Sequence, residues 1–294
     1  MRADAVLAVD IGGTKMAAAR VTGDGEVLAT ATAPTPRGTD PEAVFAALAR
    51  TIDEVRSGDE AACGVGCGGP MAPGGETVSP LNIAAWRAGF PLRTRLATLL
   101  GLPVHVDNDA KALALGQGWR GGARGERDFL AMVVSTGVGG GIVLDGRLLD
   151  GAAGNAGHIG HVIVEPAGRP CACGARGCLE AEASGPSIAA ATGRRPEDAT
   201  PETVARTGTL VGRAVASVAN LLDLRLALVA GSVALGFGRP FFAAAQAELD
   251  RSARLAFSQG TRIGPAAGGA GAPLLGAAAV GFRGLGRPVI GAGR

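Results

Sequence analysis

The chain has no excess of charge of either sign. Its 28 lysine and arginine residues face 26 aspartate and glutamate residues, so the net charge of the 294 residues is only +2. Charged residues make up just 18% of the sequence. So small a net charge gives no electrostatic basis for binding nucleic acid, and we predict that nucleic acid is not a partner.

The chain also lacks a long apolar segment. The run near the amino terminus covers residues 5–9 and ends at Asp10, which is too short for a signal peptide and has no cleavage-site pattern after it. The next longest run, residues 226–235, is too short to span a bilayer. We therefore predict a cytoplasmic protein with no membrane partner.

Cysteine is rare, yet three of the 5 cysteines fall within one short glycine-rich stretch, residues 154–180. The candidate metal ligands in this stretch are His161, Cys171, Cys173 and Cys178. One imidazole and three thiolates form a tetrahedral set suited to Zn²⁺ that leaves no open coordination position, so the metal would be structural. It would fix the neighbouring His158 and Glu180. Three unrelated buried thiols are the alternative, which the clustering disfavours.

A glycine turn follows the first apolar run. Residues 5–9 predict a buried strand, residues 17–21 predict a returning strand, and the sequence between them is Asp10-Ile11-Gly12-Gly13-Thr14-Lys15. We expect Gly12 and Gly13 to adopt positive φ and to leave room for a ligand. Backbone N–H groups and the Thr14 hydroxyl would bind the phosphate oxygens of that ligand. Asp10, at the strand end, would hold Mg²⁺ through water. A plain tight turn is the alternative.

A second turn of the same kind comes about 125 residues later. A strand predicted over residues 129–135 runs into Thr136-Gly137-Val138-Gly139-Gly140-Gly141, and residues 142–144 return. The repetition predicts a duplicated architecture with one phosphate loop in each half. Neither turn has the P-loop spacing or opens a helix, so a P-loop or a Rossmann dinucleotide site is disfavoured.

Two carboxylates and an amide, Asp107-Asn108-Asp109, follow the strand predicted over residues 104–106 and precede a predicted helix that starts near Ala110. Open α/β sheets place active-site groups at this end of a strand. Asp109 as a simple helix cap is the alternative, but capping by Asp109 does not explain Asn108. We predict a functional role for both residues.

The length allows two α/β domains, each with its own core. We place a small domain at residues 1–115, completed by a carboxyl-terminal helix within 273–294, and a larger domain with the cysteine-rich loop at 116–272. In the larger domain, Gly231 follows a buried strand over residues 226–230 and would let a flat base or ribose lie on the backbone. We predict that residues 264–271 form a mobile loop.

These motifs together resemble the ROK family of sugar kinases, within the actin-like ATPase superfamily, and the resemblance spans nearly the whole chain. The residues that carry it are the two glycine turns, Asn108-Asp109, and the zinc signature from Gly157-His158-Ile159-Gly160-His161 through Cys171-Ala172-Cys173-Gly174 to Cys178-Leu179-Glu180. The resemblance implies an actin-like fold, with two α/β domains flanking a cleft.

The resemblance also implies roles for individual residues. Asp109 would be the general base that accepts the proton of a hexose 6-hydroxyl as it attacks the γ-phosphate of ATP-Mg²⁺. The implied hexose-binding residues are Gly69, Asn82, Asn108, His158, His161 and Glu180. The implied ATP-binding residues are Asp10, Gly12, Gly13, Thr14, Lys15, Thr136, Gly137, Gly139 and Gly231. His161 would use one ring nitrogen for zinc and the other for the sugar.

The chain departs from the family pattern at three places. The family usually has Glu where this chain has His158, commonly Asn where it has Lys111, and two glycines where it has Ala230-Gly231. A neutral imidazole can donate a hydrogen bond to an N-acetyl carbonyl, which a carboxylate cannot do. We predict a glucokinase-type enzyme, and an N-acetylmannosamine kinase, some of which share the His-x-Gly-His pattern, is the alternative.

A sugar-responsive transcriptional repressor is the alternative from another class, since some family members are repressors. Those carry a helix-turn-helix domain ahead of the first glycine turn, whereas 9 residues precede Asp10 here. We therefore expect an enzyme rather than a DNA-binding protein. We also expect a homo-oligomer, either a dimer or a tetramer.

Overall fold

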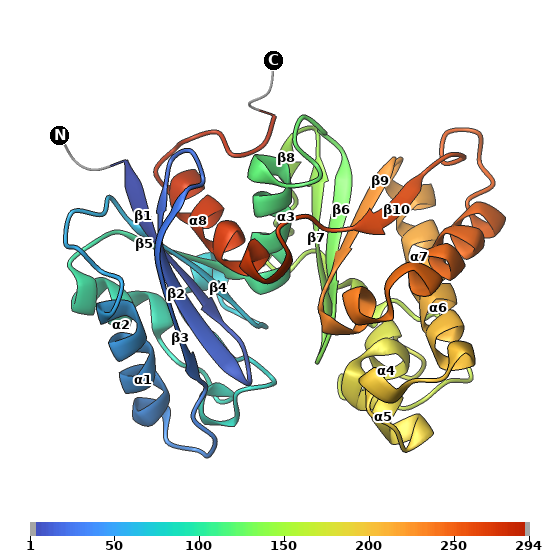
Figure 1. Cartoon of the computed structure of the whole chain (residues 1–294), viewed down its shortest axis with the longest axis horizontal. Coiled ribbons are helices and arrows are strands. Elements are labelled where there is room, and N and C mark those ends of the chain that lie inside the picture. The colour runs from blue at the N-terminus through green and yellow to red at the C-terminus, as the bar shows by residue number, and fades with distance from the viewer. Residues whose placement is uncertain (1–3, 292–294) are drawn as a thin grey trace. The chain divides into compact units, whose positions relative to one another are not determined.

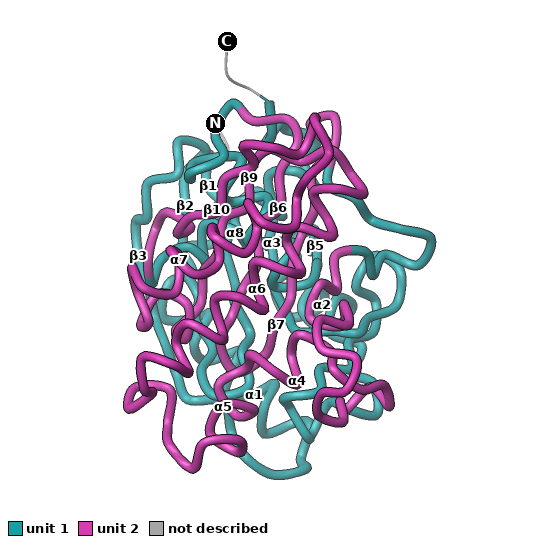
Figure 2. Tube along the Cα trace, turned by 90° about the vertical axis from the view of Figure 1, so that its right-hand side faces the viewer, with its two compact units in different colours: residues 1–125, 148–156, 270–294 teal, residues 126–147, 157–269 magenta. Residues whose placement is uncertain are grey.

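The structure, a computed structural model, describes residues 4–291, which form two compact units (Figure 2). Unit 1 takes its described residues from 1–125, 148–156 and 270–294, and unit 2 consists of 126–147 and 157–269. The chain contains two five-stranded sheets and eight α-helices within the described residues, so the predicted mixed α/β class is confirmed. The functional division into domains, whose outermost residues 1–3 and 292–294 lie outside the described part, stays a prediction.

The sheet of unit 1 has the strand order β3-β2-β1-β4-β5. Its strands are β1 (Ala5–Ile11), β2 (Lys15–Thr22), β3 (Val27–Pro34), β4 (Cys63–Cys67) and β5 (Val104–Asn108). β1 and β2 form the predicted hairpin around the first glycine turn, with Ile11 opposite Met16. β4 and β5 then extend the sheet in parallel to β1. The carboxyl ends of three neighbouring strands therefore meet at one edge.

Helices cover both faces of this sheet (Figure 1). They are α1 (Pro41–Asp53), α2 (Leu92–Leu100), α3 (Asp109–Arg120) and α8 (Ala272–Gly284). α1 and α2 share one apolar core with the sheet, in which Leu48, Ile52 and Trp86 are fully buried. α1 begins after Asp40, whose carboxylate caps the helix by accepting a hydrogen bond from the Glu42 N–H.

α3 and α8 pack closely on the opposite face, and glycine makes that approach possible. A Cβ on Gly116 of α3 would lie 2.8 Å from the backbone nitrogen of Gly276 in α8. A Cβ on Gly64 of β4 would lie 2.1 Å from the carbonyl oxygen of Ala277. α8 therefore lies directly against the sheet and holds α3, whose first residue is Asp109, in a fixed position.

The sheet of unit 2 has the order β10-β9-β6-β7-β8. Its strands are β6 (Phe129–Val134), β7 (Val138–Leu144), β8 (Arg147–Leu148), β9 (Leu226–Ala230) and β10 (Arg262–Pro265). β6 pairs antiparallel with β7 and parallel with β9, and β9 is parallel to β10. This order repeats that of unit 1, with a hairpin around a glycine turn followed by parallel strands. The duplication predicted from the two turns is therefore confirmed.

The helices of unit 2 are α4 (Leu179–Ala183), α5 (Gly185–Thr192), α6 (Pro201–Leu222) and α7 (Ser232–Ser252). α6 is capped by Thr200, whose side chain accepts a hydrogen bond from the Thr203 N–H. A Cβ on Gly212 of α6 would lie 2.2 Å from the Ala245 carbonyl oxygen, so α6 and α7 pack backbone to backbone. The prediction of a mobile loop over residues 264–271 is wrong at its start, because residues 264 and 265 belong to β10 and pair with β9.

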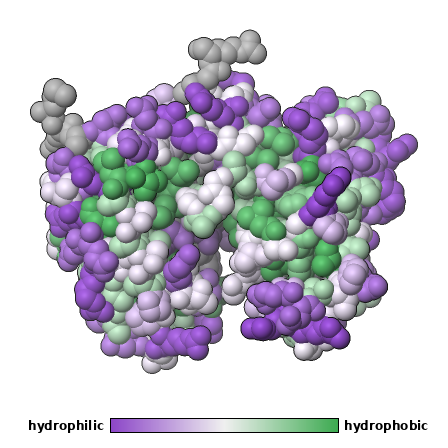
Figure 3. Space-filling view, viewed as in Figure 1, coloured by the Kyte–Doolittle hydropathy of each residue, from purple (hydrophilic) through white to green (hydrophobic). Residues whose placement is uncertain are grey.

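The described surface offers scattered apolar residues. Val27 and Leu28 in β3, Leu99 in α2 and Leu221 in α6 are exposed, and they belong to different elements. On the face drawn in Figure 3, apolar residues gather in separate patches that hydrophilic residues surround. Among the helices formed by residues 4–291, none is long and apolar enough to cross a membrane.

Candidate functional site

Acidic groups of unit 1 gather where the parallel strands end. The register of the sheet places Asp10 of β1 opposite Gly66 of β4, and Gly66 opposite Asp107 of β5. Because the three strands run in parallel, the residues that follow them lie at the same edge. Asn108 ends β5, and Asp109 begins α3 at this edge.

Asp10 and Asp109 both lie close to Gly66. A Cβ on Gly66 would be 3.6 Å from the Asp109 Cα and 3.7 Å from an Asp10 carboxylate oxygen. Burial, and to a smaller extent the negative charge of Asp109, raise the pKa of Asp10 to about 7 against the opposing effect of Lys15. Two neighbouring carboxylates in a buried setting form a pair that favours a bound cation or a shared proton.

Asn108 caps helix α3. Its side-chain oxygen accepts a hydrogen bond from the Ala110 N–H at 3.0 Å, and its backbone is extended. Asp109 is instead the first helical residue, and its carboxylate also accepts from Ala110. Our argument that capping does not explain Asn108 is therefore wrong. The Asn108 cap fixes the direction in which α3 starts.

The first glycine turn is held by short backbone contacts rather than by positive φ. The Gly12 N–H donates to the Lys15 carbonyl at 3.0 Å, and the Thr35 hydroxyl donates to the Gly12 carbonyl at 2.7 Å. Neither Gly12 nor Gly13 adopts positive φ, which corrects our expectation. Glycine is needed here for space, because a Cβ on Gly13 would lie 2.7 Å from the backbone oxygen of Asn82.

Asn82 therefore lies against the first glycine turn, as the resemblance requires of a residue near the site. Its side-chain oxygen would also lie 3.4 Å from a Cβ on Gly68, which directly follows β4 and precedes Gly69. Thr14 and Lys15 are exposed in the same turn. Unit 1 thus brings together nearly all the residues predicted for it, around the ends of β1, β4 and β5.

Lys111 is the centre of a charged network that the sequence did not predict. Only 2% of this residue is exposed, and its Nζ lies 2.9 Å from Asp107, 2.8 Å from Asp150 and 3.1 Å from the Gly154 carbonyl oxygen. Arg283 of α8 also pairs with both carboxylates. Burial raises the pKa of Asp107, and the charge of Lys111 opposes that effect. The network joins β5, α3, α8 and residues 148–156.

The second glycine turn is shorter than the sequence suggests. The Ser135 N–H donates to the Gly137 carbonyl, so the turn spans only residues 135–137. Gly139, Gly140 and Gly141 instead lie within strand β7. They permit close packing, since a Cβ on Gly140 would lie 3.0 Å from Ile159 and 3.1 Å from the Gly157 carbonyl oxygen. Our placement of these three glycines in the turn is therefore wrong.

Glu180 links the cysteine-rich loop to this turn. One of its carboxylate oxygens accepts a hydrogen bond from the Val138 N–H at 2.8 Å and would lie 3.0 Å from a Cβ on Gly137. Glu180 lies in the first turn of α4, two residues after Cys178. A side chain expected to bind sugar therefore also fixes the second glycine turn.

A cavity of about 580 Å³ opens beside the second glycine turn, and all its walls belong to unit 2. Ser135 and Thr136 lie at its polar side, and the Ser135 hydroxyl shares a hydrogen bond with Ser232 at 2.9 Å. Pro186 of α5 and Phe237 of α7 line it as well. Sequence reasoning did not find Pro186 or Phe237, since an apolar wall residue resembles a core residue in a single sequence.

Gly231 lies next to this cavity, where β9 passes into α7. Its φ of +101° is one that side chains rarely adopt, and a Cβ there would lie 2.3 Å from the Val134 carbonyl oxygen. The chain therefore needs glycine at this position to connect β9 to α7 alongside β6. The preceding Ala230 is buried within the strand.

The predicted metal ligands are brought together. One ligand atom from each of His161, Cys171, Cys173 and Cys178 lies within 4.8 Å of all the others. The His161 Nδ1 lies 3.7 Å from the Cys171 sulfur, so this nitrogen faces the thiols. Burial raises the pKa of the Cys178 thiol, which opposes ionisation unless a cation is present. The donor set and its spacing fit Zn²⁺.

The cysteine-rich loop is anchored by Glu182, which is 2% exposed. Its carboxylate accepts hydrogen bonds from the Arg169 N–H and from the Arg206 guanidinium at 2.7 Å. The His158 ring stacks near that of His161, with 6.2 Å between centroids and 16° between planes. Glu182 thus anchors the loop through Arg169, and His158 lies beside the metal-ligand candidate His161.

Taken by unit, the predicted residues fall into two sets. Unit 1 holds the acidic edge with Asp10 and Asp109, and unit 2 holds the second turn, Gly231 and the histidine and thiol cluster. Two sheets with the same strand order, each with a glycine turn in its hairpin, define an actin-like ATPase fold. Residues 6–282 match the model of the ROK family, and the chain belongs to that family.

Relatives of this chain carry two different names. An N-acetylmannosamine kinase of Citrobacter koseri is 36% identical over 251 residues, which cover 79% of this chain and 84% of that protein. A glucokinase of Streptomyces coelicolor is 40% identical over 197 residues, which cover 67% and 61%. The structure of a ROK family glucokinase from Streptomyces griseus in complex with glucose and AMPPNP is similar at a TM-score of 0.83, with 29% identity and coverage of 95% and 99%.

Proposed function

We propose that this protein is an ATP-dependent hexose kinase that transfers the γ-phosphoryl group to the sugar 6-hydroxyl. The observation that carries the proposal is the carboxylate pair of Asp10 and Asp109 at the strand ends, beside a glycine turn of a duplicated fold. Phosphoryl transfer needs a group that accepts the hydroxyl proton and a cation on the phosphates, and this pair can supply both functions.

Asp109 is the proposed general base. It begins α3, whose direction the Asn108 cap and the packing of α8 fix, so its position is well defined. Asp10 is the proposed Mg²⁺ residue and acts through water. A buried carboxylate whose pKa is raised by a neighbouring negative charge gains from a bound cation, which supports this assignment. The cation would neutralise charge on the β- and γ-phosphates.

ATP is the proposed donor, and the cavity of unit 2 is the proposed site for its base and ribose. The apolar walls that include Pro186 and Phe237 suit a flat base, and Gly231 allows backbone approach. Thr136 and Gly137 beside this cavity, and Gly12, Gly13, Thr14 and Lys15 in unit 1, are the proposed phosphate-binding residues. The ligand AMPPNP of the Streptomyces griseus neighbour supports a nucleotide as the donor.

The proposed sugar-binding residues are Gly69, Asn82, Asn108, His158, His161 and Glu180. Zn²⁺ held by His161 and the three thiolates would supply no reactive chemistry and would fix the loop that presents His158. Because His161 directs Nδ1 toward the thiols, its Nε2 is the nitrogen that would reach a sugar hydroxyl. We also propose that the protein is cytoplasmic and that it forms a homo-oligomer.

N-acetylmannosamine is the second candidate substrate, and His158 is the observation that favours it. His158 occupies the position where the family usually has a carboxylate, and an imidazole N–H can donate to an N-acetyl oxygen. The similarity to the Citrobacter koseri enzyme supports this reading, and the similarity to the Streptomyces coelicolor enzyme supports glucose.

A coupled ADP-release assay across glucose, mannose, N-acetylglucosamine and N-acetylmannosamine tests the proposal. We expect ADP release with at least one of these sugars, and no sugar-dependent release with any of them contradicts hexose kinase activity. The matched variant is His158→Glu. It should change the ratio of kcat/KM for glucose and N-acetylmannosamine by about one to two decades, since one unpaired buried partner costs about 1–3 kcal/mol. An unchanged ratio shows that His158 does not determine the sugar.

A further inference from the structure

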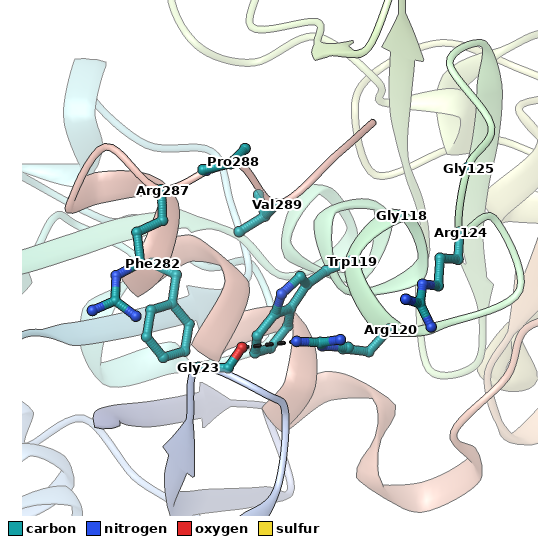
Figure 4. A pocket seen from close by; sticks show the side chains of 10 residues that line it. All are labelled: Gly23, Gly118, Trp119, Arg120, Arg124, Gly125, Phe282, Arg287, Pro288 and Val289. Carbon is teal, nitrogen blue, oxygen red and sulfur yellow. Dashed lines mark hydrogen bonds between the residues drawn. The ribbon is translucent and has the colours of Figure 1, made fainter. Parts of the chain in front are cut away.

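A second cavity lies within unit 1, at the opposite end of α3 from Asp109 (Figure 4). Its volume is about 230 Å³, below the roughly 300–1,000 Å³ of pockets for drug-sized ligands, so it suits a small molecule. Its walls come from the end of α3, from Gly23 between β2 and β3, from Phe282 of α8 and from residues 287–289. Each helical residue adds about 1.5 Å, so Arg120 lies about 17 Å along α3 from Asp109.

Three arginine residues line this cavity: Arg120, Arg124 and Arg287. Arg287 pairs with Asp4, and Arg120 donates to the Gly23 carbonyl at 2.9 Å while it lies 3.4 Å from a carboxylate oxygen of the almost fully exposed Asp24. Arg124 forms no ion pair with any residue between 4 and 291. The cavity therefore presents positive charge that its own carboxylates do not fully neutralise.

Two aromatic rings hold two of these arginines in place. The Arg120 guanidinium lies 5.1 Å from the centre of the Trp119 ring, and that of Arg287 lies 5.1 Å from the centre of the Phe282 ring. The two rings also contact each other, with centroids 5.2 Å apart. Guanidinium groups stacked on aromatic faces lose less side-chain freedom when they bind an anion, so the cavity is partly organised for one.

We propose that this cavity binds the phosphate group of a small phosphorylated molecule. Planar guanidinium groups match phosphate oxygens through paired N–H donors, and Arg124 and Arg120 are the proposed binding residues. The site is separate from the first glycine turn, because it lies at the far end of α3 from the carboxylate pair. It therefore adds a phosphate site to the one that the proposed kinase reaction uses.

Calorimetric titration of the full chain tests this site, with inorganic phosphate, glucose 6-phosphate and glucose as probes. The variants are Arg124→Gln, Arg124→Lys, and Arg50→Gln as a control that removes an exposed charge of α1. We expect both phosphate probes to bind the parent and the control, glucose 6-phosphate to bind about tenfold or more weakly to Arg124→Gln, and Arg124→Lys to recover part of the loss. If glucose 6-phosphate binds the parent and inorganic phosphate does not, the site needs the sugar as well as the phosphate group.

Two results overturn the proposal. The first is that Arg124→Gln binds each phosphate probe as tightly as the parent does, with the fold of both proteins verified by circular dichroism. The second is a loss of affinity as large in Arg50→Gln as in Arg124→Gln, which would reflect net charge alone. Sugar-dependent ADP release is measured on the same preparations and reports on the proposed kinase activity, so either proposal can fail while the other stands.

Discussion

Replacement of Lys111 by methionine tests the buried charge network. Methionine keeps most of the volume of the side chain but removes the ammonium group, which contacts Asp107, Asp150 and the Gly154 carbonyl. The Asp107 side chain is only 12% exposed, so the variant leaves a carboxylate with little access to water. Its remaining cation is Arg283, whose nitrogen lies 3.5 Å away.

The magnitude follows from the burial of each partner. Removal of one member of a buried ion pair typically costs about 3–5 kcal/mol, because the other charge stays buried. Asp150 is half exposed and keeps Arg283 at 3.0 Å, so it contributes little to the loss. We therefore expect the low end of the range, about 3 kcal/mol of unfolding free energy for Lys111→Met.

Urea denaturation measures this loss, and the other lysine provides the control. Lys15 is exposed, so Lys15→Met should change the unfolding free energy by less than about 0.5 kcal/mol. The double variant Lys111→Met with Asp107→Asn should be more stable than Lys111→Met alone, because it removes the unpaired charge. A loss below about 1 kcal/mol in Lys111→Met, or no recovery in the double variant, refutes the reasoning.

Three further outcomes follow from the structure. Burial and Asp109 place the folded-state pKa of Asp10 at about 7, above its unfolded value of 3.8, so its contribution to stability falls as pH rises from about 4 through 7. In magnesium-free buffer, the stability of Asp10→Asn relative to the parent should therefore increase from pH 5 to pH 8, by less than about 4 kcal/mol. The same stability difference between variant and parent at both pH values contradicts this. Metal analysis should find one zinc per chain in the parent and in Cys63→Ala, and a chelator should remove zinc more readily from Cys178→Ser; a parent without zinc contradicts the site. Gly231→Ala should lower the melting temperature by several degrees, because a Cβ would lie 2.3 Å from the Val134 oxygen, and an unchanged melting temperature contradicts that clash.

Local patterns in the sequence predicted the elements that carry the site. The apolar run before Asp10 and the residues after Lys15 predicted the first hairpin, and the repeated glycine turn predicted a duplicated architecture. The spacing of His161 and the three cysteines predicted their cluster. These features depend on neighbours in the chain or on ligand chemistry, which a sequence displays directly.

Long-range contacts explain what the sequence did not predict. Lys111 meets Asp150, 39 residues away, and nothing in the local sequence indicates that pairing. Gly140 lies in β7, where only a residue without a Cβ fits beside Ile159, and Asn108 is a cap because β5 extends to it. In each case the deciding partner is distant in the sequence or depends on where a strand ends.

The rate of ADP formation by the parent and by Asp109→Asn tests the central claim most directly. Asparagine keeps a side-chain oxygen that can accept the Ala110 N–H, so the start of α3 and the melting temperature should not change. With saturating ATP-Mg²⁺ and the best sugar of the panel, we predict that Asp109→Asn turns over at least about 100-fold more slowly than the parent. A folded Asp109→Asn enzyme that turns over at the rate of the parent contradicts the assignment of Asp109 as the general base.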